Sequence, residues 1–463
     1  MAEKEQASVS VSVDSQYLEA KIALFPADDG SGHVSEAQVK KALNENSVFI
    51  NVDWELIREY LKSGQPVTNL VVAKGTPSKD GENGEIDYKF PRISEYKPKL
   101  DEETGVVDFK ELGRIKNIQK GEIIAEIKYA TQGEPGKDLR GNVIAPYPGK
   151  DPKLIIGVGT ILSADKTKLY SAVDGNLRWD KDRFVVDEVV SIHGDVDVST
   201  GNIDFLGDVR ISGGIAEGFV VKGRNVSVSQ NATGATIIAT GDVEVRSGAI
   251  FTTIEAAHDI KINFAENATL SAGNDIQAKS LVSCKSFARG EINVSGGKGV
   301  IVGGETTCYG NVSATQVGSE NYTKTIINLG DTINFMKQHN EKKEAFAKQR
   351  ENFDKMTKLI EQLNALKKVQ PLTEEQQKIN AQALRYTLSE KPKIVAKQGE
   401  IDKEAVMIER FKTLKLYVRG KVFPGATVKI FTSVYDVSGE FGNCTYLRNM
   451  DTGDVECKTG TNW

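Results

Sequence analysis

The sequence holds few of the residues that build metal centres and disulfide frameworks. Its 463 residues include only four cysteines and four histidines. The cysteines form no CxxC pair, and the histidines add no metal-ligand spacing. We therefore expect no metal, no cofactor and no disulfide framework. The thiols are expected to be buried or incidental; they are Cys284, Cys308, Cys444 and Cys457.

Long apolar runs, aromatic residues and basic charge are also scarce. No apolar stretch approaches the roughly 18 residues of a membrane span, and the opening segment, MAEKEQASVSVSVDSQ, has no hydrophobic signal core. Only 7% of the residues are aromatic, and the formal net charge is -5. This balance disfavours a nucleic-acid partner. We expect a cytoplasmic protein without a membrane span.

What the sequence has in abundance is a repeat of about 17 residues. In each unit an acidic residue or Asn, often after Gly, directly precedes an aliphatic residue that alternates with a second one. One unit cannot bury its aliphatic face alone, so the pattern is typical of stacked coils. We predict a mainly β protein with a right-handed parallel β-solenoid. The first aliphatic residues of the units are Val196, Val209, Val226, Val243, Ile260, Ile276, Ile292 and Val312.

The acidic residues of the repeat fit corners between strands, where Asp, Asn and Gly adopt positive φ at low cost. The alternative is a catalytic carboxylate cluster, as in β-helical enzymes that act on polysaccharides. The same Asp recurs at the same phase in most units, so it follows the repeat and we favour corners. The residues of the alternative cluster are His193, Asp195, Asp197, Asp204 and Asp208.

The N-terminal part, residues 1–110, carries the signals of an α+β region. Ser35 begins a capping box ahead of one short helix, and Asp53 can cap a second. Alternating apolar residues then indicate strands at 67–73 and 86–90. A small β-rich module with turn glycines follows and leads into the solenoid.

A glycine-rich stretch, residues 74–84, connects those two strands. It lacks the GxxxxGK[ST] spacing of a phosphate cradle and leads into a strand instead of a helix. We interpret it as a long loop, and such loops often carry function. Lys74, Lys79 and Asp80 are therefore candidate protein-interaction residues.

Beyond residue 330 the apolar period changes from two to seven. Four apolar residues at a/d spacing in a charged stretch predict a long amphipathic helix. We expect a helical hairpin or coiled coil, and the pattern fits an intrachain pair and a homodimer seam equally well. The four residues are further candidate protein-interaction positions: Phe353, Met356, Ile360 and Leu363.

Prolines divide this helical region. Pro371 is expected to end the first helix, and a capping box at Thr373 to open a second helix to about Leu388. Pro392 is expected to mark another break before a third helix over 400–411. The predicted divisions of the chain are 1–110, 111–186, 187–330 for the solenoid, 331–412 for the helical insertion, and 413–463 for final β rungs and a cap.

Nearly the whole chain resembles the flagellar assembly protein A family. The resemblance rests on the AKGTP stretch at 73–77, GEPG at 133–136, AVDG at 172–175, the repeated GDV phrases, IVGGE at 301–305 and VRGKVFPG at 418–425. The resemblance implies an N-terminal region, a β-solenoid, and a helical segment before the last strands. It also implies a bacterial cytoplasmic protein of flagellar assembly or polar placement, with no catalytic residues to carry over.

These observations favour a non-enzymatic scaffold or adaptor that binds protein partners, and we expect a homodimer. The resemblance adds, for some family members, a signalling partner such as a component of the sugar phosphotransferase system. One alternative is a self-polymerising scaffold like the bactofilins, which requires bare solenoid ends. The other is a carbohydrate-active β-helix enzyme, which requires nonrepeating carboxylates and an aromatic groove.

Overall fold

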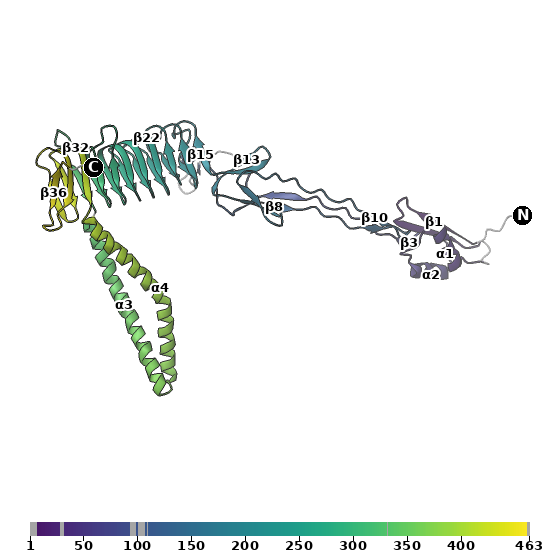
Figure 1. Cartoon of the computed structure of the whole chain (residues 1–463). Coiled ribbons are helices and arrows are strands. Elements are labelled where there is room, and N and C mark those ends of the chain that lie inside the picture. Colours follow the sequence, from purple (N-terminus) through teal and green to yellow (C-terminus); the bar gives the residue numbers. More distant parts are fainter. Residues whose placement is uncertain are drawn as a thin grey trace. The chain divides into compact units, whose positions relative to one another are not determined.

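A computed structural model gives the fold of residues 7–27, 32–92, 99–100, 107–108, 110–330 and 332–460. Contacts group the chain into two compact units. Figure 1 labels the helices and strands of both. The first unit comprises 1–93, 119–173 and 178–186, and the second comprises 94–118, 174–177 and 187–463. The five-part division of the sequence stays a prediction.

The N-terminal lobe of the first unit is an antiparallel sheet with the strand order β1, β2, β3, packed against two helices. The predicted caps are confirmed: Ser35 and Gln38 form a capping box, and the Asp53 side chain accepts a hydrogen bond from the backbone N–H of Leu56. The helices bury Val39 and Ile57 in the lobe core. The elements are β1 (Ser8–Val13), β2 (Glu19–Phe25), α1 (Glu36–Glu45), α2 (Trp54–Ser63) and β3 (Val67–Lys74).

The rest of the first unit is built on a four-stranded antiparallel sheet with the order β11, β12, β8, β4. A two-stranded ladder, β9 with β10, accompanies it. The strands are β4 (Glu85–Tyr88), β8 (Ile123–Lys128), β9 (Gly136–Lys137), β10 (Val143–Ile144), β11 (Thr160–Leu162) and β12 (Lys168–Ser171). Strands β13 (Gly175–Asp180) and β14 (Arg183–Asp187) contribute residues to both units.

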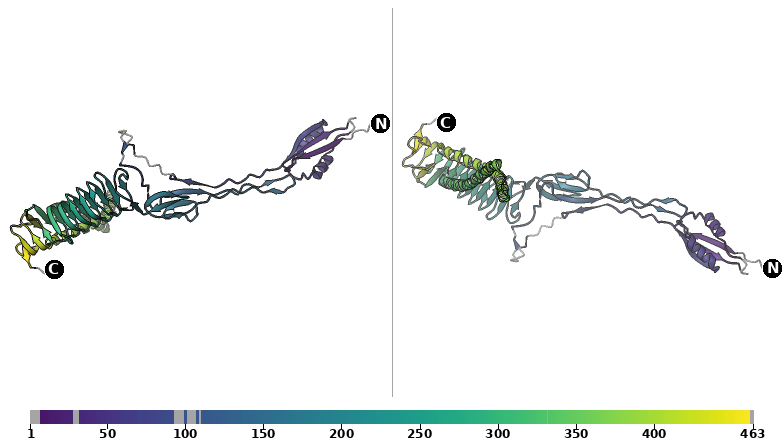
Figure 2. Two further views of the ribbon diagram at one scale, coloured as in Figure 1. Left: turned by 90° about the horizontal axis from the view of Figure 1, so that it is seen from above. Right: turned by 90° about the horizontal axis from the view of Figure 1, so that it is seen from below.

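The second unit contains the predicted β-solenoid, whose coils stack in one direction (Figures 1 and 2). Its strands pair in parallel with the strand of the next coil, so that the repeat forms one row, which is half-buried at Val190 and buried from Val209 onward. The row continues to Val312, and the next member is Leu416, beyond the helical insertion. The paired residues are Val190, Val209, Val226, Val243, Ile260, Ile276, Ile292, Val312 and Leu416.

The prediction was wrong for one residue of the row. Val196 is buried, yet it bridges Ile215 on another side of the coil, and Val190 takes its place in the row. The physical reason is the register, because Val190 lies 19 residues before Val209 and Val196 only 13. A spacing of 13 residues is too short for a complete coil here.

The solenoid consists of short strands separated by corners. They are β15 (Val189–Ile192), β16 (Ile203–Asp204), β17 (Asp208–Ile211), β18 (Val220–Gly223), β19 (Val226–Val228), β20 (Ala232–Thr233), β21 (Thr236–Ala239), β22 (Val243–Ile250), β23 (Thr253–Ala256), β24 (Ile260–Glu266), β25 (Thr269–Ala272), β26 (Ile276–Ala288), β27 (Ile292–Val294), β28 (Val300–Cys308), β29 (Val312–Ala314), β30 (Gln316–Val317), β31 (Thr325–Leu329), β32 (Lys415–Val422) and β33 (Ala426–Ile430).

Segments outside the coils contact both ends of the solenoid. At the first coils, Lys110 Nζ donates to the carbonyl of Gly218 at 2.8 Å, and Asn117 Nδ2 donates to that of Asp204 at 2.9 Å. At the last coils the pairing changes from parallel to antiparallel, where β35 joins β32 and β34 joins β33. The remaining strands of this unit are β5 (Lys99–Leu100), β6 (Val107–Asp108), β7 (Asn117–Ile118), β34 (Ser433–Asp436), β35 (Phe441–Arg448) and β36 (Val455–Thr459).

The helical insertion is a pair of helices, α3 (Thr332–Val369) and α4 (Glu374–Phe411), each of 38 residues. Pro371 lies between them, and Thr373 forms the predicted capping box with Gln376. Residue 331, where the insertion was predicted to begin, lies outside the described residues.

The predicted break at Pro392 was wrong, because α4 runs through it without interruption. Proline removes the hydrogen bond to the carbonyl four residues earlier, here that of Leu388. Leu388 is 73% exposed, so this turn of the helix faces water. Packing of α4 against α3 on either side of the proline outweighs the local preference, and Figure 1 shows α4 bent.

Candidate functional site

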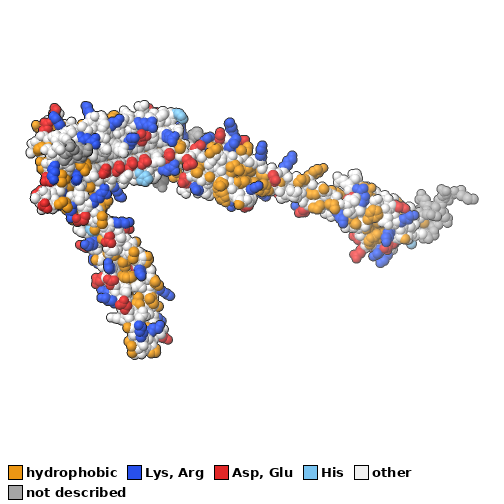
Figure 3. Space-filling model, in the orientation of Figure 1, with side chains coloured by type: hydrophobic (Ala, Val, Ile, Leu, Met, Phe, Trp, Pro, Cys, Tyr) orange, Lys and Arg blue, Asp and Glu red, His pale blue; other side chains and the backbone are white. Residues whose placement is uncertain are grey.

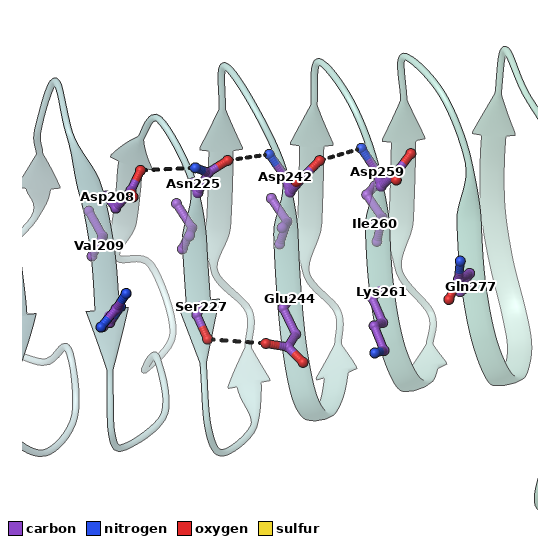
Figure 4. A pocket seen from close by; sticks show the side chains of 13 residues that line it. Asp208, Val209, Asn225, Ser227, Asp242, Glu244, Asp259, Ile260, Lys261 and Gln277 are labelled. Carbon is purple, nitrogen blue, oxygen red and sulfur yellow. Dashed lines mark hydrogen bonds between the residues drawn. The ribbon is translucent and has the colours of Figure 1, made fainter. Parts of the chain in front are cut away.

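The solenoid presents a polar face with a shallow groove that runs from β17 to β26 (Figure 4). Acidic side chains form a line along the solenoid in Figure 3. Aliphatic residues of the buried row separate the polar residues of the groove. These polar residues are Asp208, Arg210, Asn225, Ser227, Asp242, Glu244, Asp259, Lys261 and Gln277.

The carboxylates and amides at this corner tie each coil to the next. Asp208 Oδ1 accepts a hydrogen bond from Asn225 Nδ2 at 2.9 Å, and Asn225 Oδ1 accepts one from the backbone N–H of Asp242 at 2.9 Å. The backbone N–H groups of Asp259 and Asp275 donate to the preceding carboxylates at 3.1 Å. Figure 4 shows the first three of these links. The line of acidic residues is thus a hydrogen-bonded ladder.

Carboxylates of the alternative catalytic cluster from the sequence analysis also accept hydrogen bonds from nearby residues. Asp195 Oδ1 accepts from the backbone N–H of Gly214 at 2.7 Å. Asp197 accepts from the hydroxyl and backbone N–H of Ser199, which lowers the pKa of its carboxyl. A hydrogen bond from Arg224 lowers the pKa of Asp208. Within the described ranges, no three His, Cys, Asp or Glu residues are grouped to hold a metal ion.

Substitutions at Asp259 should distinguish a structural role of this carboxylate in the hydrogen-bonded ladder from a role in a chemical site. Its Oδ1 accepts from Asn274 Nδ2 at 2.7 Å and from the backbone N–H of Asp275 at 3.1 Å. Asp259→Ala removes the acceptor and should destabilise the solenoid by about 1 kcal/mol. Asp259→Asn keeps an oxygen there and should cost less than half as much. Urea denaturation of both variants measures the difference, and equal losses would contradict the ladder.

Three of the four cysteines are buried, and burial raises the pKa of their thiols. Burial raises the pKa of the Cys308 thiol to about 12, and burial beside Cys457 raises the pKa of Cys444 to about 12. Burial also raises the pKa of Cys284. A nucleophilic cysteine needs a lowered pKa and access to solvent. These three thiols fit the expected role as buried, unreactive side chains.

The glycine-rich stretch 74–84 is not the free loop that its sequence suggested. It is an extended segment that runs beside two others, 130–137 and 146–151, and together we call them the rod. Lys79 exchanges backbone hydrogen bonds with Glu134, and the Asp80 carboxylate accepts from the backbone N–H of Tyr147 at 2.9 Å. The partners lie more than 50 residues away in sequence, so no local pattern indicated the pairing.

The rod gives the three N-terminal candidates different surroundings. The side chains of Lys74 and Lys79 are exposed, Lys74 at the end of β3 and Lys79 within the rod. Asp80 is exposed too, but its carboxylate joins two rod segments. The two lysines are therefore the members of this set that are available to a partner protein, and their role in binding stays a prediction.

The heptad residues of α3 pack largely against α4 of the same chain. Leu363 is buried, Phe353 and Ile360 are half-buried, and Met356 is 37% exposed. Ala383 and Ile401 of α4 are also buried. The apolar period therefore forms an intrachain seam between the two helices. Of the four hairpin candidates, Met356 is the most available to another protein.

Polar contacts near the solenoid end of the hairpin fix one helix against the other. His339 Nδ1 lies 3.0 Å from Glu404 Oε2, and Lys342 Nζ lies 2.5 Å from the other oxygen of Glu404. The contact with Glu404 raises the pKa of Lys342. Farther along, Gln349 Nε2 donates to Glu390 at 2.8 Å. These links hold the helices in one register.

An aromatic cluster anchors the hairpin on the solenoid. The ring of Phe411, at the end of α4, lies 5.0 Å from that of Tyr309 and 5.3 Å from that of Phe335 near the start of α3. Phe287 of β26 extends the cluster, with its ring 5.1 Å from Tyr309. The sequence interpretation missed this anchor. The available signal was a phenylalanine at each end of the helical insertion.

No helix in the described part of the chain is long and apolar enough to cross a membrane. Two family models match the sequence. One, described as the flagellar assembly protein A N-terminal region, matches residues 9–182, and the other, described as the flagellar assembly protein A beta solenoid domain, matches residues 188–454. Comparisons with curated proteins and with solved structures gave no match.

Proposed function

The chain belongs to the flagellar assembly protein A family, and on that premise we propose that it serves flagellar assembly or polar placement as a non-enzymatic cytoplasmic scaffold that binds protein partners. The observation that carries the proposal is the match of both family regions over nearly the whole chain. For some family members the sequence resemblance suggests a phosphotransferase-system protein as partner, and we include that class among the partners to test.

The segments that contact both ends of the solenoid support a discrete adaptor over a filament. Solenoids polymerise when terminal strands offer unpaired backbone groups to another chain. Here antiparallel strands follow the last coils, and hydrogen bonds from Lys110 and Asn117 reach the first ones. A bactofilin-like polymer would have to displace these additions.

Two surfaces are offered to partners in this proposal, the exposed lysines of segment 74–84 and the hairpin from 331 to 389. The hairpin projects from a rigid repeat and is anchored by packed aromatic rings. A rigid support lowers the entropy that a partner must remove on binding. The ladder carboxylates hold coils together in this proposal and perform no catalysis.

The test is genetic. The gene is deleted in its source bacterium and restored either intact or without residues 335–410, which a short linker replaces. We expect the deletion to reduce or misplace flagella, the intact gene to restore them, and the shortened gene to fail at equal protein level. Flagella are counted by electron microscopy. A deletion strain with normal flagella would refute the flagellar role, and full rescue by the shortened gene would remove the hairpin from it.

A Lys74→Glu, Lys79→Glu variant tests the other surface in the same strain. We expect weaker rescue if these lysines contact the partner. The matched control is Lys40→Glu, Lys41→Glu on exposed positions of α1. Equal rescue by both variants would exclude the lysines of segment 74–84 from the interface.

A further inference from the structure

Helix α4 carries a second apolar surface that the hairpin leaves uncovered. Leu384, Leu388, Val395 and Val406 are 41%, 73%, 65% and 70% exposed. The seam with α3 uses other residues of the same helix, among them the buried Ala383. Figure 3 shows hydrophobic side chains among charged ones on the hairpin surface. We call these four residues the outer stripe.

The outer stripe is continuous in helical geometry. At about 100° per residue, its four members project within about 40° of one another, and they span about 33 Å along the axis. Ala383 projects about 100° away from Leu384. An apolar line of this length on a water-exposed helix is typical of a helix-packing surface, and this one passes through the bend of α4 at Pro392.

Two charged residues interrupt the stripe in a particular order. Lys391 lies on the N-terminal side of Val395 and Asp402 on its C-terminal side, and both are exposed. Asp402 projects within about 40° of all four apolar residues, whereas Lys391 projects within about 40° of Leu384 and Val395 and about 60° from Leu388 and Val406. The Asp402 carboxylate accepts a hydrogen bond from Gln398 one turn earlier at 2.8 Å.

An antiparallel pair of α4 helices brings the opposite charges of the stripe together. When two copies of α4 run antiparallel about a twofold axis at Val395, Val395 meets itself and Leu384 meets Val406 of the other copy, while Leu388 lies opposite the other copy's Asp402. Lys391 then comes within one helical turn of the other copy's Asp402, at two symmetric places. A parallel pair would instead place Lys391 beside Lys391 and Asp402 beside Asp402, which is repulsive.

We propose that the outer stripe of α4 binds a second copy of this chain, in an antiparallel helix pair centred on Val395. The partner is identified by the apolar contacts of Leu384, Val395 and Val406 and by the two opposite-charge contacts. The seam between α3 and α4 is already used within one chain, so the dimer is formed by the opposite part of the hairpin. This inference does not depend on the flagellar role.

Cysteine crosslinking of the full chain tests the register. In a Cys457→Ser background, Val395→Cys should form a disulfide-linked dimer on mild oxidation with copper phenanthroline. A mixture of Leu384→Cys and Val406→Cys chains should crosslink to each other at least tenfold more than either does to itself. The control is Ala396→Cys, which is also exposed on α4 but lies about 100° from Val395. Crosslinking of Leu384→Cys chains to themselves, or equal crosslinking at 395 and 396, would overturn the arrangement.

Light scattering after size exclusion tests the dimer without crosslinks. The native chain should have twice the mass of one 50.5 kDa protomer, and Val395→Asp should be monomeric with an unchanged circular dichroism spectrum. Lys391→Asp should weaken the dimer about tenfold, since two contacts become repulsive. Adding Asp402→Lys to the Lys391→Asp variant should restore the dimer. A monomeric native chain would overturn the inference and leave the flagellar test unaffected, and a charge exchange without rescue would overturn the antiparallel register.

Discussion

Gly81→Ala should open the rod in the first unit and destabilise that part of the chain by about 3 kcal/mol. A Cβ atom at residue 81 would overlap the carbonyl oxygen of Thr131 and lie 2.7 Å from the backbone nitrogen of Gly149. Both neighbours are backbone atoms, so no side-chain rotation relieves the overlap. The backbone N–H of Gly81 also donates to the carbonyl of Tyr147 at 2.9 Å, and that bond should break as the segments separate.

Hydrogen exchange followed by mass spectrometry measures this effect. Peptides that contain Gly81, Thr131 and Gly149 should exchange more than about a hundredfold faster in the variant, because each 1.4 kcal/mol corresponds to a factor of ten. The matched control is Gly32→Ala, where the nearest atom to an added Cβ is 3.7 Å away and φ is ordinary. Unchanged exchange in the Gly81→Ala rod would show that the three segments are not packed as described.

Phe411→Ala should release the hairpin from the solenoid, at a cost of about 3–5 kcal/mol. The side chain is 0% exposed, and its ring packs on Tyr309 and Phe335. It also covers Gly330, where an added Cβ would lie 2.7 Å from the Phe411 ring. Loss of the ring leaves a cavity at the point where the chain leaves and re-enters the solenoid.

The expected signature is local. Exchange should accelerate at the solenoid ends of α3 and α4 and in β32, while coils from β17 to β22 keep native protection. Phe251→Ala serves as the control, since Phe251 is a solenoid phenylalanine that is 66% exposed, and its loss should change stability by less than about 0.5 kcal/mol. Similar exchange in the two variants would mean that the aromatic cluster does not anchor the hairpin.

The solenoid could be predicted from the sequence because a repeat converts a local pattern into tertiary register. Once Val226 recurs as Val243 and Ile260, stacking alone places these side chains in one buried row. The capping boxes at Ser35 and Thr373 were equally accessible, since their signals lie within four residues of chain.

The rod and the continuity of α4 through Pro392 could not be predicted from the sequence in this way. The rod is held mostly by backbone hydrogen bonds between segments far apart in sequence, with a few side-chain contacts such as that of Asp80. Backbone hydrogen bonds leave no pattern of side chains in the sequence. Pro392 carries a local signal for a break, and contacts with α3 override it. The aromatic anchor joins Phe335 to Phe411 across 76 positions, a pairing that follows only from the return path of the hairpin.

Because α3 and α4 have the same length of 38 residues, the hairpin returns the chain to the place where it left the solenoid. The last coil, in which Leu416 succeeds Val312, depends on that return and not on how far the hairpin extends. Equal insertions or deletions of whole helical turns in both helices would therefore change the length of the hairpin by about 5.4 Å per turn. The register of the solenoid would stay intact. Evolution can vary the distance at which the tip is presented without having to redesign the body that carries it.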